Sequence, residues 1–321
     1  MKICLFGAGA VGCFIVGHLA QVPGCEVSVV GRGEQLNAIK RGGLRVLTPR
    51  GDLRARIPAT DRPEELGVQD YVFITLKSNQ VPAALDQLSP LIGSHTVVLP
   101  PTTGIPFWFF DGDANGDLRL RRVDPGDRQR AAIEPWRVLG CVYWMPVEVV
   151  APGVVRQHGS RGSFPVGEPD GTSSQRVSRL AAAMRAGGLD TSISLDIRAE
   201  IWMKAVSSLC LNPIATLTRA TLGEIGASAE LARLVRQMML EADAMAVRLG
   251  VRPSTSVDER IELAFQAGPH RMSMLQDLER GRPLEFDTIK ASFDDIRELA
   301  GLPTPTLDLV MALMALRAAR T

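Results

Sequence analysis

The chain shows two successive patterns of apolar and polar residues. Up to about residue 195, short apolar runs typical of strands alternate with stretches of helical spacing, and from residue 196 onward the spacing is helical throughout. The expected strands are Lys2–Phe6, Glu26–Val30, Leu44–Leu47, Leu53–Ile57, Tyr71–Leu76, Thr96–Leu99, Val138–Trp144, Gly153–Gln157, Phe164–Gly167 and Thr191–Leu195. This alternation predicts an open, mostly parallel sheet covered by helices on both faces.

The second half reads as a series of helices separated by glycine and proline, which are helix stop and start signals. The expected helices of the first half, apart from one after the first strand, are Glu34–Arg41, Val81–Leu91 and Ser174–Ala186. Those of the second half are Asp196–Leu211, Ala227–Leu249, Ser256–Gln266, Met272–Arg280, Pro283–Ala300 and Thr306–Ala319. We therefore predict an α/β domain over residues 1–195 and an all-helical domain over residues 196–321.

A glycine-rich turn joins the first expected strand to the first expected helix. In a strand–turn–helix context, the first glycine allows the tight turn, the second admits a pyrophosphate, and the third lets helix and strand pack closely. The amide groups that open the helix also attract phosphate. A Rossmann-type domain is therefore predicted, with a dinucleotide bound by the six residues of the turn, Gly7, Ala8, Gly9, Ala10, Val11 and Gly12.

The residues after the second strand indicate which dinucleotide is bound. An acidic residue there would bind the ribose of NAD, whereas an arginine accommodates the 2′-phosphate of NADP. Here Arg32 follows the strand, and Glu34 is expected to begin the next helix. Arg32 therefore favours NADP(H), although a solvated surface arginine would have the same sequence signature.

Composition and charge narrow the class of protein. The 321 residues are 45% hydrophobic, and 36 Lys and Arg face 35 Asp and Glu, which excludes a strongly basic nucleic-acid binder. No apolar run reaches the ~18 residues of a membrane span. The five cysteines are scattered without any Cys-x-x-Cys pair, so we expect a reducing compartment, most simply the cytoplasm. A secretory signal is the alternative for the apolar start, but four glycines interrupt it.

One segment, Asp111–Arg130, is irregular and rich in Asp, Gly and Arg. It begins like a calcium loop, but Arg122 occupies the position that needs a bidentate glutamate. We therefore expect a mobile surface insertion without metal. The four histidines, His18, His95, His158 and His270, have no metal-ligand spacing either.

The helix expected at Asp196–Leu211 is apolar almost all round, which predicts that it is buried. Lys204, Ser208 and Asn212 are four residues apart and would form one polar stripe along it. Burial lowers the pKa of an ammonium group toward neutrality, which suits a proton donor. The alternative is a lysine that reaches solvent with its apolar stem buried.

Two further positions carry candidate chemistry. Pro283 at a first helical position would place Glu285 in the opening turn, where the helix dipole favours a carboxylate. A purely structural role is the alternative for Glu285. Lys77 follows the strand Tyr71–Leu76 and would lie at the carboxyl edge of the sheet, where cofactors bind but where an ordinary exposed lysine also fits.

The chain resembles the ketopantoate reductase (2-dehydropantoate 2-reductase) family nearly from end to end. The motifs that carry the resemblance are Gly7-Ala8-Gly9-Ala10-Val11-Gly12, Leu76-Lys77, Trp202-Met203-Lys204, Asn212-Pro213, Ser273-Met274-Leu275-Gln276-Asp277 and Glu285-Phe286-Asp287. The resemblance implies NADPH-dependent reduction of 2-dehydropantoate to pantoate, a step of pantothenate biosynthesis.

The resemblance also implies roles for individual residues. Lys204 would be the general acid, and Asn212, Ser273 and Glu285 would line the substrate site. By the same resemblance, Arg32 and Lys77 would contact the phosphate of NADP. The developing alkoxide would be stabilised and protonated by the lysine.

Three positions depart from the family pattern. Thr103, a candidate for cofactor binding, and Ser208, a candidate for substrate binding, stand where the family usually has asparagine, and Leu222 replaces a third asparagine. Lost carboxamides remove donors and acceptors that orient a substrate. A related dehydrogenase of another small 2-oxo or hydroxy acid is therefore an alternative, as is a dinucleotide sensor without catalysis. The late helices carry apolar residues such as Met311, Leu313, Met314 and Leu316, which would suit either the interface of a homodimer or the core.

Overall fold

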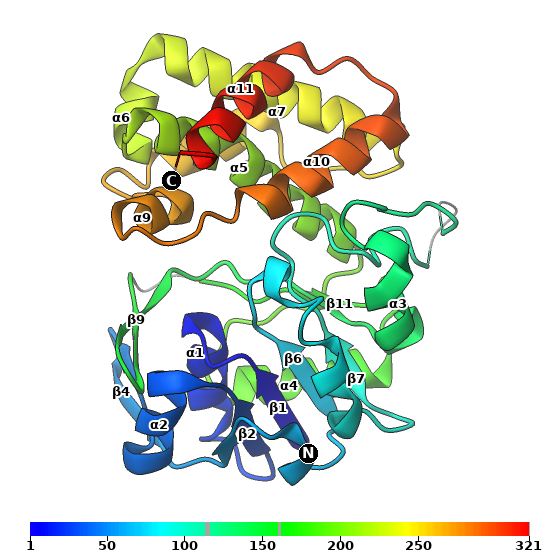
Figure 1. Cartoon of the computed structure of the whole chain (residues 1–321), viewed down its shortest axis with the longest axis vertical. Coiled ribbons are helices and arrows are strands. Elements are labelled where there is room, and N and C mark those ends of the chain that lie inside the picture. Colours follow the sequence, from blue (N-terminus) through cyan, green and yellow to red (C-terminus); the bar gives the residue numbers. More distant parts are fainter. Residues whose placement is uncertain (113–115, 160–161, 321) are drawn as a thin grey trace. The chain divides into compact units, whose positions relative to one another are not determined.

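The computed structural model describes residues 1–112, 116–159 and 162–320, and its chain divides into two compact units (Figure 1). Unit 1 comprises Met1–Thr102, Phe110–Ala114 and Asp127–Ile197. Unit 2 comprises Thr103–Phe109, Asn115–Gly126 and Arg198–Thr321. In the described residues, no helix is long and apolar enough to cross a membrane.

Unit 1 is built on a parallel sheet with the order β5-β2-β1-β6-β7. Its strands are β1 (Lys2–Phe6), β2 (Glu26–Val30), β5 (Ala59–Thr60), β6 (Tyr71–Ile74) and β7 (Val97–Leu99). The strand order reverses between β1 and β6, which is the point where open α/β sheets bind ligands. Phe6 pairs with both Val30 and Ile74, so β1, β2 and β6 end at the same level. The Rossmann-type prediction is confirmed.

A second, four-stranded sheet lies beside helix α1 (Ala10–Leu19) in unit 1. Its order is β4-β3-β10-β9, from β3 (Leu44–Thr48), β4 (Gly51–Ala55), β9 (Val147–Ala151) and β10 (Val154–Gln157). A Cβ added to Gly17 of α1 would lie 2.3 Å from Val46 Cγ2, so the helix lies close against β3. β3 and β4 pair antiparallel as a hairpin.

The remaining elements of the described chain before α5 are helices, two-residue strands and 3₁₀ segments. They are α2 (Gly33–Gly42), α3 (Arg128–Ala132), α4 (Gln175–Ala186), β8 (Gly140–Cys141), β11 (Val166–Gly167) and five 3₁₀ segments at Pro63–Glu65, Ser78–Gln80, Leu85–Leu91, Pro125–Asp127 and Pro135–Arg137. Glu34 lies in the first turn of α2, as expected.

Unit 2 is helical. Its helices are α5 (Ile197–Thr218, whose first residue is assigned to unit 1), α6 (Leu222–Ala227), α7 (Ala229–Arg248), α8 (Val257–Phe265), α9 (Ser273–Glu279), α10 (Phe286–Ala300) and α11 (Pro305–Ala318). α7 packs against α6, α8, α10 and α11. The buried Glu241 of α7 accepts hydrogen bonds from the Thr306 and Leu307 amides, which fixes the beginning of α11.

Several predicted elements of the first half are wrong in extent. The helix expected at Val81–Leu91 is only a 3₁₀ segment at Leu85–Leu91, because prolines stand at positions 82 and 90 and break the α-helical hydrogen-bond pattern. The strand expected at Val138–Trp144 shortens to β8. The strand expected at Thr191–Leu195 keeps a single bridge, between Ile193 and Val166, because β11 offers it only two residues.

Two helix boundaries of unit 2 also differ from prediction. α5 does not end at Leu211 but continues through Pro213 to Thr218. α10 begins at Phe286 rather than Pro283, so Glu285 is the residue that precedes the first turn and not a member of it. α6 was not predicted at all, because its six residues are too few to show periodicity.

Most of the described residues of Asp111–Arg130 are partly or fully exposed, as expected of a surface insertion, but three contacts anchor the segment. Leu120 and Gln129 are buried, and the Arg122 and Val123 amides donate to the buried Asp295 carboxylate of α10. Asp111 is ion-paired with Arg130, so its carboxylate is engaged by a guanidinium. Residues 113–115 of the calcium-like sequence lie outside the described residues.

Candidate functional site

The glycine turn, Gly7–Gly12, is closely packed against the end of β6. Gly7 has a φ of 124°, and a Cβ there would lie 2.9 Å from the Leu76 nitrogen. A Cβ on Gly12 would lie 2.4 Å from Thr75 Oγ1 and 2.5 Å from the Gly7 carbonyl oxygen. Thr75 Oγ1 also donates to the Gly7 carbonyl at 2.7 Å, which ties the turn to β6. Both positions therefore require glycine.

The opposite side of the turn leaves space. The nearest atom to a Cβ on Gly9 would be the Thr75 carbonyl oxygen at 3.7 Å. Gly9 precedes α1 in an extended conformation, and no side chain in the described chain caps this helix. The first amides of α1, on Ala10, Val11 and Gly12, are thus available to an anion. A glycine cradle below a helix start fits the pyrophosphate of a dinucleotide.

Arg32 and Lys77 flank this cradle in unit 1. Arg32 follows β2, is exposed, and makes no ion pair with any residue in the described ranges. Lys77 is partly buried and precedes the 3₁₀ segment after β6. Because β1, β2 and β6 end at the same level, both cations lie at the edge that carries the glycine turn.

Cys13 lies directly behind the turn in α1. Its Sγ donates to the Ala8 carbonyl, and Gln35 Nε2 donates to the same sulfur. Burial raises the pKa of the Cys13 thiol to about 11, and the hydrogen bond from Gln35 only partly opposes this shift. The thiol is therefore neutral and acts as a packing residue of the cradle.

In unit 2, the polar stripe of α5 is graded in burial. Lys204 and Ser208 are partly exposed, whereas Asn212 is only 2% exposed. Asn212 Oδ1 accepts a hydrogen bond from the Met274 amide at 3.2 Å, next to Ser273, the exposed first residue of α9. Unit 2 thus brings the stripe and Ser273 together.

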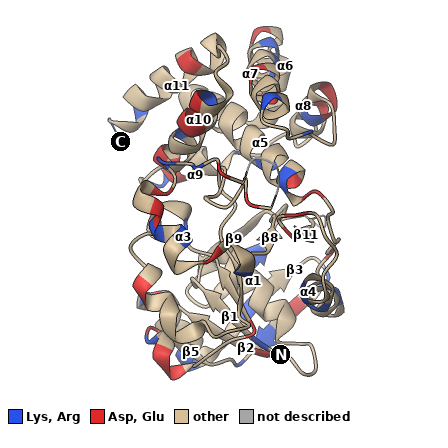
Figure 2. Ribbon diagram, turned by 90° about the vertical axis from the view of Figure 1, so that its right-hand side faces the viewer, with Lys and Arg blue, Asp and Glu red and all other residues tan. Residues whose placement is uncertain are grey.

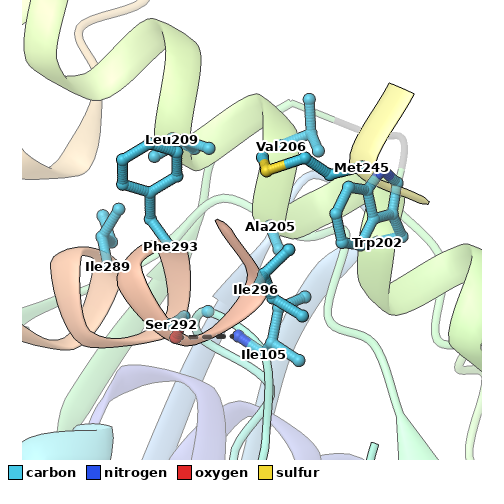
Figure 3. Close-up of a pocket in the computed structure, with 11 residues that line it drawn as sticks. Ile105, Trp202, Ala205, Val206, Leu209, Met245, Ile289, Ser292, Phe293 and Ile296 are labelled. Carbon is cyan, nitrogen blue, oxygen red and sulfur yellow. Dashed lines mark hydrogen bonds between the residues drawn. The ribbon is translucent and has the colours of Figure 1, made fainter. Parts of the chain in front are cut away.

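Two further predicted site residues in unit 2 are joined through α10. Glu285 is partly buried and immediately precedes α10. Thr103 begins the segment Thr103–Phe109, hereafter the Thr103 segment, which is bound to α10 where the Ile105 amide donates to Ser292 Oγ at 3.1 Å (Figure 3). Leu222, in contrast, is buried in the apolar core at the start of α6.

A small apolar pocket lies where the Thr103 segment, α5 and α10 meet. The pocket is lined by the eleven residues drawn in Figure 3, all but Gly104 labelled there: Gly104, Ile105, Trp202, Ala205, Val206, Leu209, Met245, Ile289, Ser292, Phe293 and Ile296. At about 100° per residue, the α5 face that lines the pocket is turned about 110° from the lysine stripe. The pocket therefore supports the segments that carry the candidate residues and does not contain the lysine itself.

Sequence reasoning missed the residues that hold the side chain of Trp202, which lies two positions before Lys204 on α5. Trp202 Nε1 donates to Asp243 Oδ1 at 3.3 Å, and the buried Arg260 is ion-paired with Asp243. Ser292 was missed as well. Neither contact has a local sequence signal, because the partners are between 17 and 187 residues apart.

Charge does not separate the two units. Figure 2 shows basic and acidic residues interspersed along the helices of both, in line with the nearly equal numbers of the two kinds. The candidate sites are therefore defined by individual side chains and not by a general field of one sign.

Comparisons with known protein families give matches in both halves of the chain. The model of the family "Ketopantoate reductase PanE/ApbA" matches residues 3–105, and that of its C-terminal part matches residues 196–318. A 2-dehydropantoate 2-reductase from Mesorhizobium japonicum is 44% identical over 317 residues, which cover 98% of this chain and 97% of the relative.

Solved structures show the same fold over the whole length. A candidate ketopantoate reductase from Ralstonia solanacearum MolK2 has a TM-score of 0.91 and 34% identity, covering 99% of this chain and 98% of that one. A 2-dehydropantoate 2-reductase from Methylococcus capsulatus has a TM-score of 0.83 and 27% identity, with 100% and 97% covered. On the family models and the 44% identical relative together, this chain belongs to the ketopantoate reductase family.

Proposed function

We propose that this protein reduces 2-dehydropantoate to pantoate with NADPH. The observation that carries the proposal is the hydrogen bond from the Met274 amide to Asn212, because it holds the α5 stripe next to Ser273 in a chain so similar to a 2-dehydropantoate 2-reductase. The protein is thereby an oxidoreductase acting on a C=O/CH–OH pair. Of the two predicted domains, residues 1–195 would bind the dinucleotide and residues 196–321 would bind the substrate.

The cofactor would be held by unit 1. The turn residues Gly7, Ala8, Gly9, Ala10, Val11 and Gly12 would surround the pyrophosphate. The first amides of α1, on Ala10, Val11 and Gly12, would donate to it, whereas the Gly7 amide is already bound to the Val30 carbonyl oxygen. The Arg32 guanidinium, which is exposed, suits a 2′-phosphate because its planar donors match phosphate oxygens. Lys77 adds a second positive charge at this edge. We therefore propose NADP(H) over NAD(H), with Thr103 as a further cofactor contact.

Bound NADPH supplies a hydride to the carbonyl carbon of the substrate. Lys204 is proposed to hold the carbonyl oxygen through its ammonium group, to stabilise the negative charge that develops there, and to give that oxygen its proton. At the substrate one C–H and one O–H bond would form and the C=O double bond would become a single bond, while a C–H bond of the reduced cofactor and an N–H bond of the Lys204 ammonium would break. Afterwards Lys204 regains a proton from solvent.

The remaining residues orient the substrate. Ser273 would donate its hydroxyl to the substrate carboxylate, and Glu285 would accept from the substrate hydroxyl. Ser208 lies one turn from Lys204 and would bind the same side of the substrate. Asn212 would contribute mainly through α9, because its carbonyl oxygen is already bound to the Met274 amide.

A different small 2-oxo acid is the second candidate substrate. Thr103 and Ser208 favour it, since each replaces a carboxamide by a shorter hydroxyl group. The test is NADPH oxidation by the purified protein with 2-dehydropantoate and a panel of other 2-oxo acids. Highest kcat/KM for 2-dehydropantoate is expected. Preference for another acid would replace the substrate, and binding of NADPH without turnover of any acid would indicate a dinucleotide sensor.

We also propose where and in which form the protein works. The five cysteines are free thiols, which fits the reducing cytoplasm. A homodimer through α11 is proposed because Leu313 and Leu316 are half exposed, whereas Met311 and Met314 of the same helix are buried. Light scattering of the purified protein measures its mass, and a monomer at micromolar concentration would contradict the dimer.

A further inference from the structure

Ser292 is a buried hydroxyl group on α10 that has no part in the proposed proton or hydride transfer. It is 4% exposed, and its Oγ accepts from the Ile105 amide at 3.1 Å while donating to the Thr288 carbonyl at 2.9 Å. A hydroxyl group has one proton, and here the proton is directed to Thr288. The lone pairs of Oγ are thus oriented to accept from Ile105, and a directional bond joins α10 to the Thr103 segment.

Gly104 shows that this junction is closely fitted. Its φ is 72°, a left-handed conformation that favours glycine. A Cβ at this position would lie 2.5 Å from Ser292 Oγ but 3.5 Å from Ser292 Cβ. A methyl group at position 104 would therefore overlap with the Ser292 hydroxyl oxygen, whereas Ser292 Cβ and the Thr288 carbonyl oxygen would lie at ordinary contact distance.

The same helix carries a candidate substrate residue at its beginning. Glu285 immediately precedes α10, and Ser292 lies seven residues further, about two helical turns away. Two turns of helix move as one body, so a tie at Ser292 also sets the distance between Thr103 and Glu285. The pocket around the tie is apolar, and apolar packing has no directional preference that could replace the hydrogen bond.

We propose that Ser292 is a positioning residue that sets the place of Thr103 relative to Glu285, and thereby the affinity of the protein for its ligands. The identity of those ligands rests on the proposed function. The tie itself is a property of the folded chain and can be tested without any ligand.

The first experiment is hydrogen exchange of the Ile105 amide in the wild type and in Ser292→Ala, without cofactor. Exchange at Ile105 is expected to accelerate about tenfold in the variant, because the acceptor is lost, while exchange in α7 stays unchanged. In kinetics, the KM for NADPH is expected to rise about threefold to tenfold, with a smaller effect on kcat. A purely structural role would leave KM unchanged at temperatures where the variant is folded.

A double-mutant cycle with Gly104→Ala tests the close fit. Gly104→Ala alone places a methyl group against Ser292 Oγ and should raise the KM for NADPH by about tenfold or more. In Gly104→Ala/Ser292→Ala the oxygen is gone and the nearest side-chain atom is 3.5 Å away. The double variant is therefore expected to be no worse than Gly104→Ala, and a product of the two single effects would contradict the proposal.

Thr304→Val is the matched control, since it removes another buried hydroxyl of unit 2, which donates to Asp308 Oδ1 at 3.1 Å. It should lower the melting temperature about as much as Ser292→Ala but leave Ile105 exchange and the KM for NADPH unchanged. The proposal is overturned if Ile105 stays protected in Ser292→Ala, or if Thr304→Val raises KM equally. Absence of turnover in the wild type would reject the proposed function instead, and the exchange result would still decide on Ser292.

Discussion

The substitution Gly12→Ala tests whether the glycine turn is shaped for a dinucleotide. A methyl group there would lie 2.4 Å from Thr75 Oγ1 and 2.5 Å from the Gly7 carbonyl oxygen, about 1 Å inside the optimal separation of ~3.5 Å. The Gly7 oxygen belongs to the backbone, so relief requires a shift of the turn itself. Overpacking of this kind costs about 1–3 kcal/mol.

The same shift displaces the amides that would bind the pyrophosphate. Since about 1.4 kcal/mol corresponds to a tenfold change in affinity, we expect the Kd for NADPH to rise about 10- to 100-fold in Gly12→Ala. Titration calorimetry or the change in nicotinamide fluorescence measures this Kd, and thermal unfolding measures the loss of stability.

Two further glycines provide controls for this prediction. Gly17 lies in the same helix as Gly12, and Gly17→Ala would place a Cβ 2.3 Å from Cγ2 of Val46 in β3, so it should lower stability but leave the Kd for NADPH unchanged. Gly42→Ala, at the end of α2, has no atom within 4 Å of the new Cβ and should be neutral or stabilising by up to about 1 kcal/mol. Wild-type affinity in Gly12→Ala, or an equal loss in Gly17→Ala, would refute the reasoning.

Three other predictions concern stability and reactivity. Glu241→Ala should destabilise the protein by about 3 kcal/mol, because the Thr306 and Leu307 amides lose their buried acceptor. Urea unfolding measures this loss of free energy, and it should show no comparable loss for Glu230→Ala, since Glu230 is exposed. Burial lowers the pKa of His18 below its usual 6.5. The stability contributed by the neutral His18 is therefore complete above pH 6.5 and is lost as the pH falls through the lower pKa of the folded state. In His18→Gln the dependence of the unfolding free energy on pH between pH 7 and 5 should become flatter, and an unchanged dependence would contradict this. Burial raises the pKa of Cys4 to about 12 and that of Cys13 to about 11. Iodoacetamide at pH 8 should therefore label the partly exposed Cys25 first, which peptide mass spectrometry of the labelled protein can establish. Earlier labelling of Cys4 or Cys13 would contradict the burial of these two thiols.

The sequence predicts well those parts of the fold that depend on local pattern. The strands around the glycine turn are apolar and bounded by turn residues, so β1, β2 and β6 were placed correctly. Boundaries set by tertiary context were not. α5 continues through Pro213 because surrounding helices bury it, although proline after asparagine normally indicates a helix end. α10 likewise begins at Phe286, which is buried, and not at Pro283.

The candidate site follows the same division. Residues with a motif of their own, such as the glycine turn and Lys204, can be picked out from the sequence and from the family resemblance. Residues that act by holding others cannot, because their contacts join distant parts of the chain. Ser292 reaches Ile105 across 187 positions, and Asp295 reaches Arg122 across 173. Neither residue differs in sequence from an ordinary polar position on a helix.

The most direct test of the account is single-turnover reduction of 2-dehydropantoate by the Lys204→Ala variant with saturating NADPH. If the ammonium stabilises and protonates the carbonyl oxygen, the rate should fall about 10²- to 10⁴-fold, with the Kd for NADPH within about twofold of the wild type. Lys290→Ala, which removes a lysine that is ion-paired with Asp294 on α10, should keep the wild-type rate. A rate in Lys204→Ala equal to that of the wild type would contradict the assignment of Lys204 as the proton donor.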